Sequence, residues 1–136
     1  MKITTSQAQG RVPVTILSLQ GNLDGSNYQA VIAKANEVYT AGAQNLLIDM
    51  GEVPFMASSG LVALHSIALI MRGEEPPGPE AGWGAFHAID RDRDSGLQQH
   101  LKLLNPQPTV DRTLEMTGMK EFFEIHTDLE AAVASF

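Results

Sequence analysis

Residues 46–61 read Leu-Leu-Ile-Asp-Met-Gly-Glu-Val-Pro-Phe-Met-Ala-Ser-Ser-Gly-Leu. A short apolar run ends at Asp49, a loop with glycine and proline follows, and Ser58 and Ser59 precede a second apolar segment. This pattern predicts a buried strand, a surface loop and a helix whose first backbone amides face the two hydroxyls, with Ser59 as the capping residue. A phosphate there would be stabilised by the positive end of the helix dipole. The stretch therefore predicts a place where charge can be added without unfolding the chain.

The segments on either side of this stretch alternate between strand and helix patterns. Apolar residues recur at every second position in some segments and at helical spacing in others. We expect strands at Lys2–Thr5, Val12–Gln20, Asn45–Asp49, Leu101–Leu104 and Phe122–His126, and helices at Tyr28–Tyr39, Ser59–Arg72, Thr109–Thr117 and Asp128–Phe136. The alternation predicts a single α/β domain in which a mixed sheet of four to five strands packs with about four helices.

Polar and glycine residues near these segments indicate how the helices begin and end. Asp24 or Ser26 is the expected N-cap of the first helix, and Gly42 is expected to end it. Thr127 or Asp128 is expected to cap the last helix, in which Leu129, Ala132 and Val133 would face the interior. The loop that carries Asp24 therefore leads directly into a helix.

Length and composition limit the possible functions. The chain has 136 residues and a formal net charge of −7, which fits one domain with its own core. The negative charge and the lack of a basic patch argue against nucleic acid or an anionic membrane as partner, and suit a protein with a basic face. There is no cysteine, so disulfides and thiolate chemistry are excluded. We find no signal peptide pattern and no apolar stretch long enough to span a bilayer, and we expect a cytoplasmic protein.

Residues that often carry catalysis or bind metals form no recognisable arrangement. The four histidines lack metal-ligand spacing and fall on different predicted elements: His65, His87, His100 and His126. Ser58 and Ser59 lack the Gly-x-Ser-x-Gly elbow of serine hydrolases, and neither common glycine-rich phosphate loop occurs. The alternating charges of Asp90–Asp94 lack the glycine and distal glutamate of a calcium loop and predict a solvated turn. We therefore predict that the protein is not an enzyme and needs no cofactor or metal.

Residues 55–61, Phe-Met-Ala-Ser-Ser-Gly-Leu, resemble the signature of the STAS domain, which is typified by bacterial anti-sigma factor antagonists (anti-anti-sigma factors). In that signature an apolar strand ends in Asp, and a loop leads to Phe-Met-Asp-Ser-Ser/Thr-Gly-Leu. The chain matches in order and spacing, except that Ala57 replaces the acid. Gly21–Asp24 resembles the family's Gly-x-Leu/Ile-Asp, and residues 103–126 resemble its closing elements. The resemblance covers nearly the whole chain apart from residues 74–99.

The resemblance implies a STAS-like fold and a non-enzymatic regulator of bacterial transcription. The family's phosphorylated serine directly follows the acid, a position that falls on Ser58. The implied partners are an anti-sigma factor with the character of a serine kinase and a serine phosphatase that reverses the modification. ATP would belong to the kinase, so no cofactor is implied for this chain. The partner is expected to contact Asp24, Met56, Ala57, Ser58, Ser59, Gly60 and Leu61.

The two serines and Ala57 also fit a second interpretation. Ser58 and Ser59 suit a purely structural role at the start of a helix. Ala57 cannot supply a carboxylate that engages a kinase arginine or orients the acceptor hydroxyl. This favours an alternative function, an unphosphorylated STAS scaffold or accessory subunit of a stressosome-like or transport complex. Asp49 fits a turn at the end of a strand better than a partner contact.

The segment after the second predicted helix departs from the family pattern. STAS domains usually pass from this helix to the next strand in a few residues, so we expect residues 74–99 to be an insertion within one domain spanning residues 1–136. Glu74–Pro79 is rich in proline and predicts a solvated loop. Trp83 and Phe86 restore apolar character, which favours partial docking over disorder. We expect the segment to contribute a docking surface and to be removable.

Overall fold

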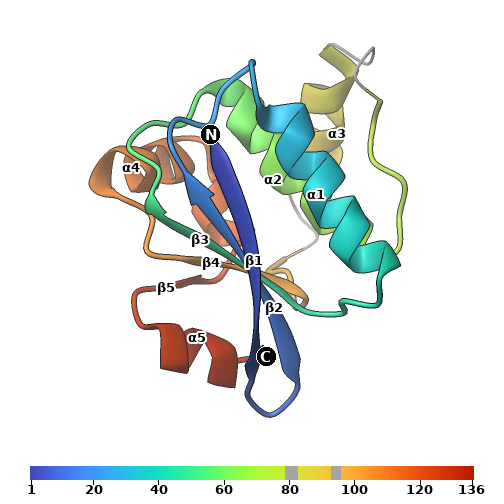
Figure 1. Cartoon of the computed structure of the whole chain (residues 1–136). Helices are drawn as coiled ribbons and strands as arrows, with labels where there is room; N and C mark the ends of the chain where they lie inside the picture. Colours follow the sequence, from blue (N-terminus) through green and yellow to red (C-terminus); the bar gives the residue numbers. More distant parts are fainter. Residues whose placement is uncertain (79–82, 93–95) are drawn as a thin grey trace.

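A mixed sheet forms the centre of the structure, a computed structural model that describes residues 1–78, 83–92 and 96–136. Its strands lie in the order β1-β2-β3-β4-β5 (Figure 1). β1 and β2 form an antiparallel hairpin, and each later pair of neighbours is parallel. The strands are β1 Lys2–Gln9, β2 Pro13–Gln20, β3 Leu46–Glu52, β4 Leu101–Leu104 and β5 Ile125–His126.

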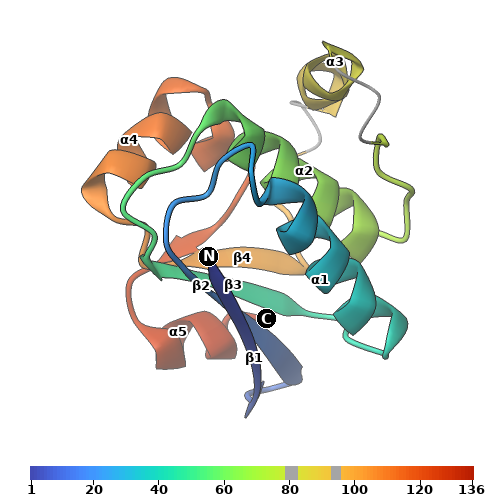
Figure 2. The ribbon, with the colours of Figure 1, turned by 45° about the horizontal axis from the view of Figure 1, so that its top comes forward.

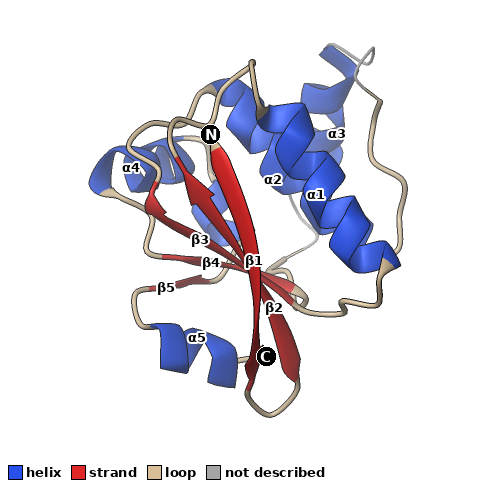
Figure 3. Ribbon diagram, viewed as in Figure 1, coloured by secondary structure: helices blue, strands red, loops and turns tan. Residues whose placement is uncertain are grey.

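Helices cover the two faces of the sheet unequally (Figure 2). α1, α2 and α4 lie over one face, α5 lies over the other, and α3 packs on the outside of α2 rather than on the sheet. The helices are α1 Tyr28–Thr40, α2 Ser58–Met71, α3 Trp83–Asp92, α4 Pro108–Met116 and α5 Leu129–Ala134, and a short 3-10 helix, η3, spans Met119–Glu121. Figure 3 shows the alternation of strands and helices, which confirms the predicted α/β domain with a mixed sheet.

Two apolar clusters fill the two sides of the sheet. Leu46 and Ile48 of β3 belong to the larger cluster, whereas Leu47 belongs to the smaller one together with Val133 of α5. This division follows from the alternation of side chains along a strand. Leu46, Leu47 and Ile48 are each 0% exposed. β3 is therefore buried on both faces, as its continuous apolar run predicts.

Gly42 and the last helix test the predicted helix ends. Gly42 follows α1 with a φ of +115°, a backbone conformation that residues other than glycine rarely adopt. Its predicted role in ending the helix is confirmed. Asp128 caps α5 as predicted, because its Oδ2 accepts a hydrogen bond from the amide of Ala131 at 2.9 Å. Leu129 is 46% exposed. The prediction that Leu129 faces the interior is therefore wrong, whereas the same prediction for Ala132 and Val133 is confirmed.

The described part of residues 74–99 is more ordered than the sequence suggests. Residues 83–92 form α3, in which Ala85 is buried and Ile89 packs against the larger apolar cluster. The expected docking of this segment is therefore found, as a helix. Residues 90–92 form the last turn of α3, so the predicted turn is wrong for them, although Asp90 and Arg91 are exposed as expected and only Asp92 of the three is half-buried. Residues 93 and 94 of that predicted turn, and the side chain of Trp83, lie outside the described residues.

Candidate partner-binding site around Ser58

Two loops at one end of the sheet are joined by backbone hydrogen bonds. The amide of Leu23 donates to the carbonyl of Phe55 at 3.0 Å, and the amide of Ala57 donates to the carbonyl of Leu23 at 2.9 Å. Leu23 and Met56 thereby form an isolated parallel bridge. The loop that carries Asp24 and the loop that leads to Ser58 are thus held together as one unit.

Close packing beneath these loops explains why the sequence has glycine at position 60. A Cβ on Gly60 would lie 2.3 Å from Cγ of Met56 and 3.1 Å from Cγ of Leu23. Met56 and Leu61 are also buried, with exposures of 2% and 8%. Among the predicted contact residues, Met56, Gly60 and Leu61 therefore lie behind the surface, where they fix the path of the loop.

The two serines begin α2 but do not cap it. The N-cap is Ala57, whose backbone is extended, and no side chain caps the helix. Ser58 is the first helical residue and is exposed, and Ser59 is the second and is half-buried. The prediction that Ser59 caps the helix is therefore wrong, because the helix already begins at Ser58 and its N-cap is Ala57. The first turn also contains no acidic residue, so the positive end of the helix dipole lies beside Ser58 without a neutralising carboxylate.

Asp24 forms a turn of its own next to these serines. Its Oδ1 accepts hydrogen bonds from the hydroxyl of Ser26 at 2.6 Å and from the Ser26 amide at 2.9 Å. These two hydrogen bonds lower the pKa of Asp24 below 3.8, so its carboxylate is charged at neutral pH. The predicted cap of α1 by Asp24 or Ser26 is wrong. The N-cap is Asn27, which makes no side-chain capping bond, because its Oδ1 accepts from the amide of Asp24 at 3.0 Å.

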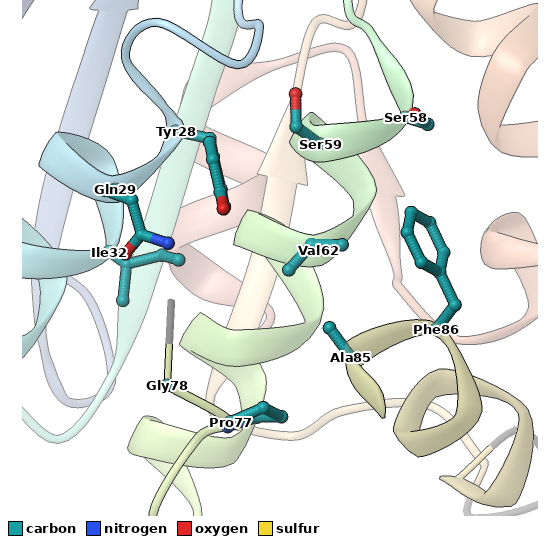
Figure 4. A pocket seen from close by; sticks show the side chains of 10 residues that line it. All are labelled: Tyr28, Gln29, Ile32, Ser58, Ser59, Val62, Pro77, Gly78, Ala85 and Phe86. Atoms are coloured by element: carbon teal, nitrogen blue, oxygen red, sulfur yellow. The ribbon is translucent and has the colours of Figure 1, made fainter. Parts of the chain in front are cut away.

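A groove of about 370 Å³ lies against the first turns of α1 and α2 (Figure 4). Three segments line this Ser58 groove: Tyr28, Gln29 and Ile32 of α1, Ser58, Ser59 and Val62 of α2, and Pro77, Gly78, Ala85 and Phe86 from the predicted insertion. In Figure 4 Phe86 of α3 lies on the side of Ser58, across α2 from Tyr28. The contributions of α1 and α3 were missed at the sequence level, since only the three-dimensional arrangement brings them beside the serines.

Asp49 lies within β3, and Asn105 directly follows β4. The strand predicted to end at Asp49 continues to Glu52, so the prediction of a strand-end turn at Asp49 is wrong, and its Oδ1 accepts a hydrogen bond from the amide of Gly51 at 3.0 Å within β3. Gln107 donates to the carbonyl of Gly51 at 2.9 Å. Asn105, directly after β4, has a φ of +53°. These bonds fix the ends of β3 and β4.

Comparison with protein families decides the classification. The family model of the STAS domain matches residues 5–72, half of the chain. The chain belongs to the STAS domain family. The match contains both joined loops of this STAS domain and ends at Arg72, before α3. A sequence comparison with curated proteins finds no match.

Solved structures share the STAS fold along almost the whole chain. A candidate anti-sigma factor antagonist from Thermotoga maritima has a TM-score of 0.69 at 14% identity, over 96% of this chain and 90% of that one. An anti-sigma factor antagonist from Mycobacterium paratuberculosis gives 0.65 at 19% identity, over 98% and 93%. The anti-sigma factor antagonist SpoIIAA in its unphosphorylated form gives 0.55 at 15% identity, over 97% and 94%. At these identities the likeness concerns the fold.

Two further observations concern membranes and metals. Among the residues that the structure describes, no helix is long and apolar enough to cross a membrane. Within the same residues, no three histidine, cysteine or acidic side chains gather in a way that could hold a metal ion.

Proposed function

We propose that this STAS protein is a non-enzymatic regulatory module that binds an anti-sigma factor and is switched by phosphorylation of Ser58. The observation that carries the proposal is the position of Ser58, which is exposed as the first residue of α2 and joined through the loop to the Asp24 turn. SpoIIAA, which shares the fold, has been solved in a phosphorylated and an unphosphorylated form. The partner would carry the kinase activity and the ATP, and a serine phosphatase would reverse the modification.

Phosphorylation at this position would act through charge. A phosphate adds about −1.5 to −2 units of charge at neutral pH. The uncapped amides of α2 and the positive end of its dipole stabilise that charge, so the fold is retained. The nearby Asp24 carboxylate and the apolar lining of the Ser58 groove do not neutralise it. A partner surface that fits the unmodified protein would then face an unpaired charge on binding.

The adjacent serines provide the matched experiment. The protein is incubated with ATP and an anti-sigma factor kinase encoded beside its gene, and its intact mass is followed with time. We expect one phosphate on the wild type and on Ser59→Ala, and none on Ser58→Ala. Phosphate uptake by Ser58→Ala, or no uptake by the wild type with any such kinase, would contradict the proposal.

Ala57 favours a second candidate, an unphosphorylated scaffold or accessory STAS subunit. Ala57 is half-buried at the N-cap, and no carboxylate occupies the position where the family signature has one. Intact mass of the protein isolated from cells distinguishes the two candidates, since the scaffold would carry no phosphate under any growth condition. Ala57→Asp should raise the initial phosphorylation rate if the missing carboxylate limits the reaction.

A further inference from the structure

We infer that the carboxylate of Asp92 ties α3 to α2 through His65 and Arg72, and that α3 held in this way restricts access to Ser58. The first part concerns the fold alone. The second part rests on the proposed function for its biological meaning, although access to Ser58 can be measured without any partner. We call the three side chains the α2–α3 tie.

The tie begins with the spacing of two residues. His65 and Arg72 are seven positions apart, which places them on the same side of α2 two turns from each other. The side chain of His65 is 3% exposed within α2, and Arg72 follows the last helical residue. Asp92 is the last residue of α3. The two ends of the contact therefore belong to different elements, and Asp92 lies in the part of the chain that the STAS family model does not match.

The distances define a hydrogen-bonded cluster around one carboxylate. Nε2 of His65 lies 3.0 Å from Oδ2 of Asp92, and Nη1 of Arg72 lies 3.2 Å from Oδ1 and 3.0 Å from Oδ2. Nε of Arg72 also donates to Glu74 at 2.8 Å, which orients the guanidinium. Among buried side-chain polar atoms of the described residues, none lacks a partner. Since unpaired buried polar groups destabilise a fold, loss of Asp92 would leave His65 without this compensation.

The charge states agree with this geometry. Burial alone would raise the pKa of Asp92, but the hydrogen bonds from Arg72 and His65 outweigh it and hold the pKa below 3.8. Burial lowers the pKa of His65 below 6.5 despite its bond to Asp92. At neutral pH the cluster is therefore a neutral imidazole and a guanidinium that both donate to an ionised carboxylate.

α3 benefits from such a tie because it is short. It has ten residues, and helices shorter than about 12–15 residues are marginal in water without tertiary contacts. Among the α3 side chains that the structure describes, Ala85 is buried and Ile89 is half-buried. The Asp92 contacts join the last turn of α3 to α2, whereas Ala85 and Phe86 lie in its first turn. The tie thus fixes the end of α3 opposite to the groove.

The position of α3 determines what can reach Ser58. Ala85 and Phe86 form one wall of the Ser58 groove, and Ser58, Ser59 and Val62 of α2 form the adjoining wall (Figure 4). A protein partner that approaches the Ser58 hydroxyl from this side must fit against Phe86. We therefore assign Asp92 as a positioning residue and Phe86 as a selectivity residue for the partner of the proposed function.

The first test measures whether Asp92 holds α3. Hydrogen exchange of the backbone amides is compared for the wild type, Asp92→Asn and Glu75→Gln, which changes the charge by the same amount at an exposed position. We expect the amides of α3 to exchange about tenfold faster in Asp92→Asn, with those of β3 and α1 unchanged and Glu75→Gln like the wild type. Equal exchange of α3 in all three proteins would overturn the tie.

The second test measures access to position 58 without a partner. Because the chain has no cysteine, Ser58→Cys introduces a single thiol, and Thr127→Cys introduces one at an exposed position before α5 as the control. Each thiol is reacted with Ellman's reagent and with a bulky maleimide-linked polyethylene glycol. We expect Asp92→Asn and Phe86→Ala to raise the ratio of bulky to small reagent rates at position 58 by about threefold, and not at position 127. An unchanged ratio at position 58 would overturn the role of α3 in access.

These results are independent of the phosphorylation assay. If exchange and thiol rates change as expected but no kinase modifies Ser58, the proposed function fails and the inference on α3 stands. If the kinase modifies Ser58 while both measurements show no effect of Asp92→Asn, the inference fails and the proposed function stands.

Discussion

Gly60 is the residue on which the path of the Ser58 loop most directly depends, because Met56 Cγ lies 2.3 Å from where its Cβ would be. We expect Gly60→Ala to lower the free energy of unfolding by about 1–3 kcal/mol, since the added methyl group must displace Met56. Chemical denaturation measures this change. Gly25→Ala is the matched control, because nothing lies within 4 Å of its Cβ position, and its effect should stay within about 0.5 kcal/mol. Equal effects of the two substitutions would contradict the packing argument.

Ser58 differs from Gly60 in that charge can be added there without disturbing the core. We expect Ser58→Asp to unfold at the same temperature as the wild type, because its side chain is exposed beside the uncapped amides of α2. Its affinity for the anti-sigma partner should fall by about tenfold or more. Calorimetric titration measures the affinity, with Ser58→Asn as the uncharged control. Equal affinity of the charged variant and the wild type would contradict the switch.

At the scale of elements, α3 is the part that departs most from the sequence prediction. We propose that residues 74–99 are an insertion and expect the variant in which a short Gly/Ser link replaces residues 74–95 to fold. Its unfolding free energy should fall by about 2–4 kcal/mol, because His65 and Arg72 lose the Asp92 carboxylate and Ile89 leaves the core surface. Cooperative denaturant unfolding tests this expectation.

The control for this deletion is a substitution of His65, which loses the Asp92 carboxylate when residues 74–95 are replaced. His65→Leu in the shortened protein should recover part of the lost stability, since an apolar side chain needs no hydrogen-bond partner. No cooperative transition in either protein would mean that α3 belongs to the core. A loss of stability that His65→Leu does not reduce would contradict the contribution of the tie.

Hydrophobic periodicity was enough to predict most elements but not their starts. The alternating and helical patterns lie within β2, β3, α1 and α2 because these segments pack into the two apolar clusters on either side of the sheet. The caps of α1 and α2 were missed because backbone bonds between Leu23 and residues 55–57 fix the loop, and Asp24 satisfies its own turn. The Ser58 groove could not be predicted, since no local pattern indicates that Phe86 lies beside Ser58.

For the whole molecule, His65 links stability to pH. Its pKa is below 6.5 in the folded protein because the side chain is buried. Between this folded pKa and the higher pKa of the unfolded chain, the unfolded chain binds more protons than the folded protein. The stabilisation is fully present above about pH 6.5 and is lost as the pH falls toward the folded pKa. We expect the unfolding free energy to fall as the pH is lowered through this window. His65→Gln should show a smaller decrease, and an identical pH dependence would contradict this assignment.

The hydrogen bonds that join the Asp24 and Ser58 loops have a consequence for how a partner senses phosphate. A double loop held by Leu23 on one side and by Phe55 and Ala57 on the other offers little freedom to change shape. The modified and unmodified forms would then differ in electrostatic potential rather than in outline. Because salt screens exposed charges over about 8 Å at physiological ionic strength, the partner's preference for the unmodified form should weaken steadily as salt is added. The difference in partner affinity between the two forms would therefore depend on ionic strength as well as on the kinase.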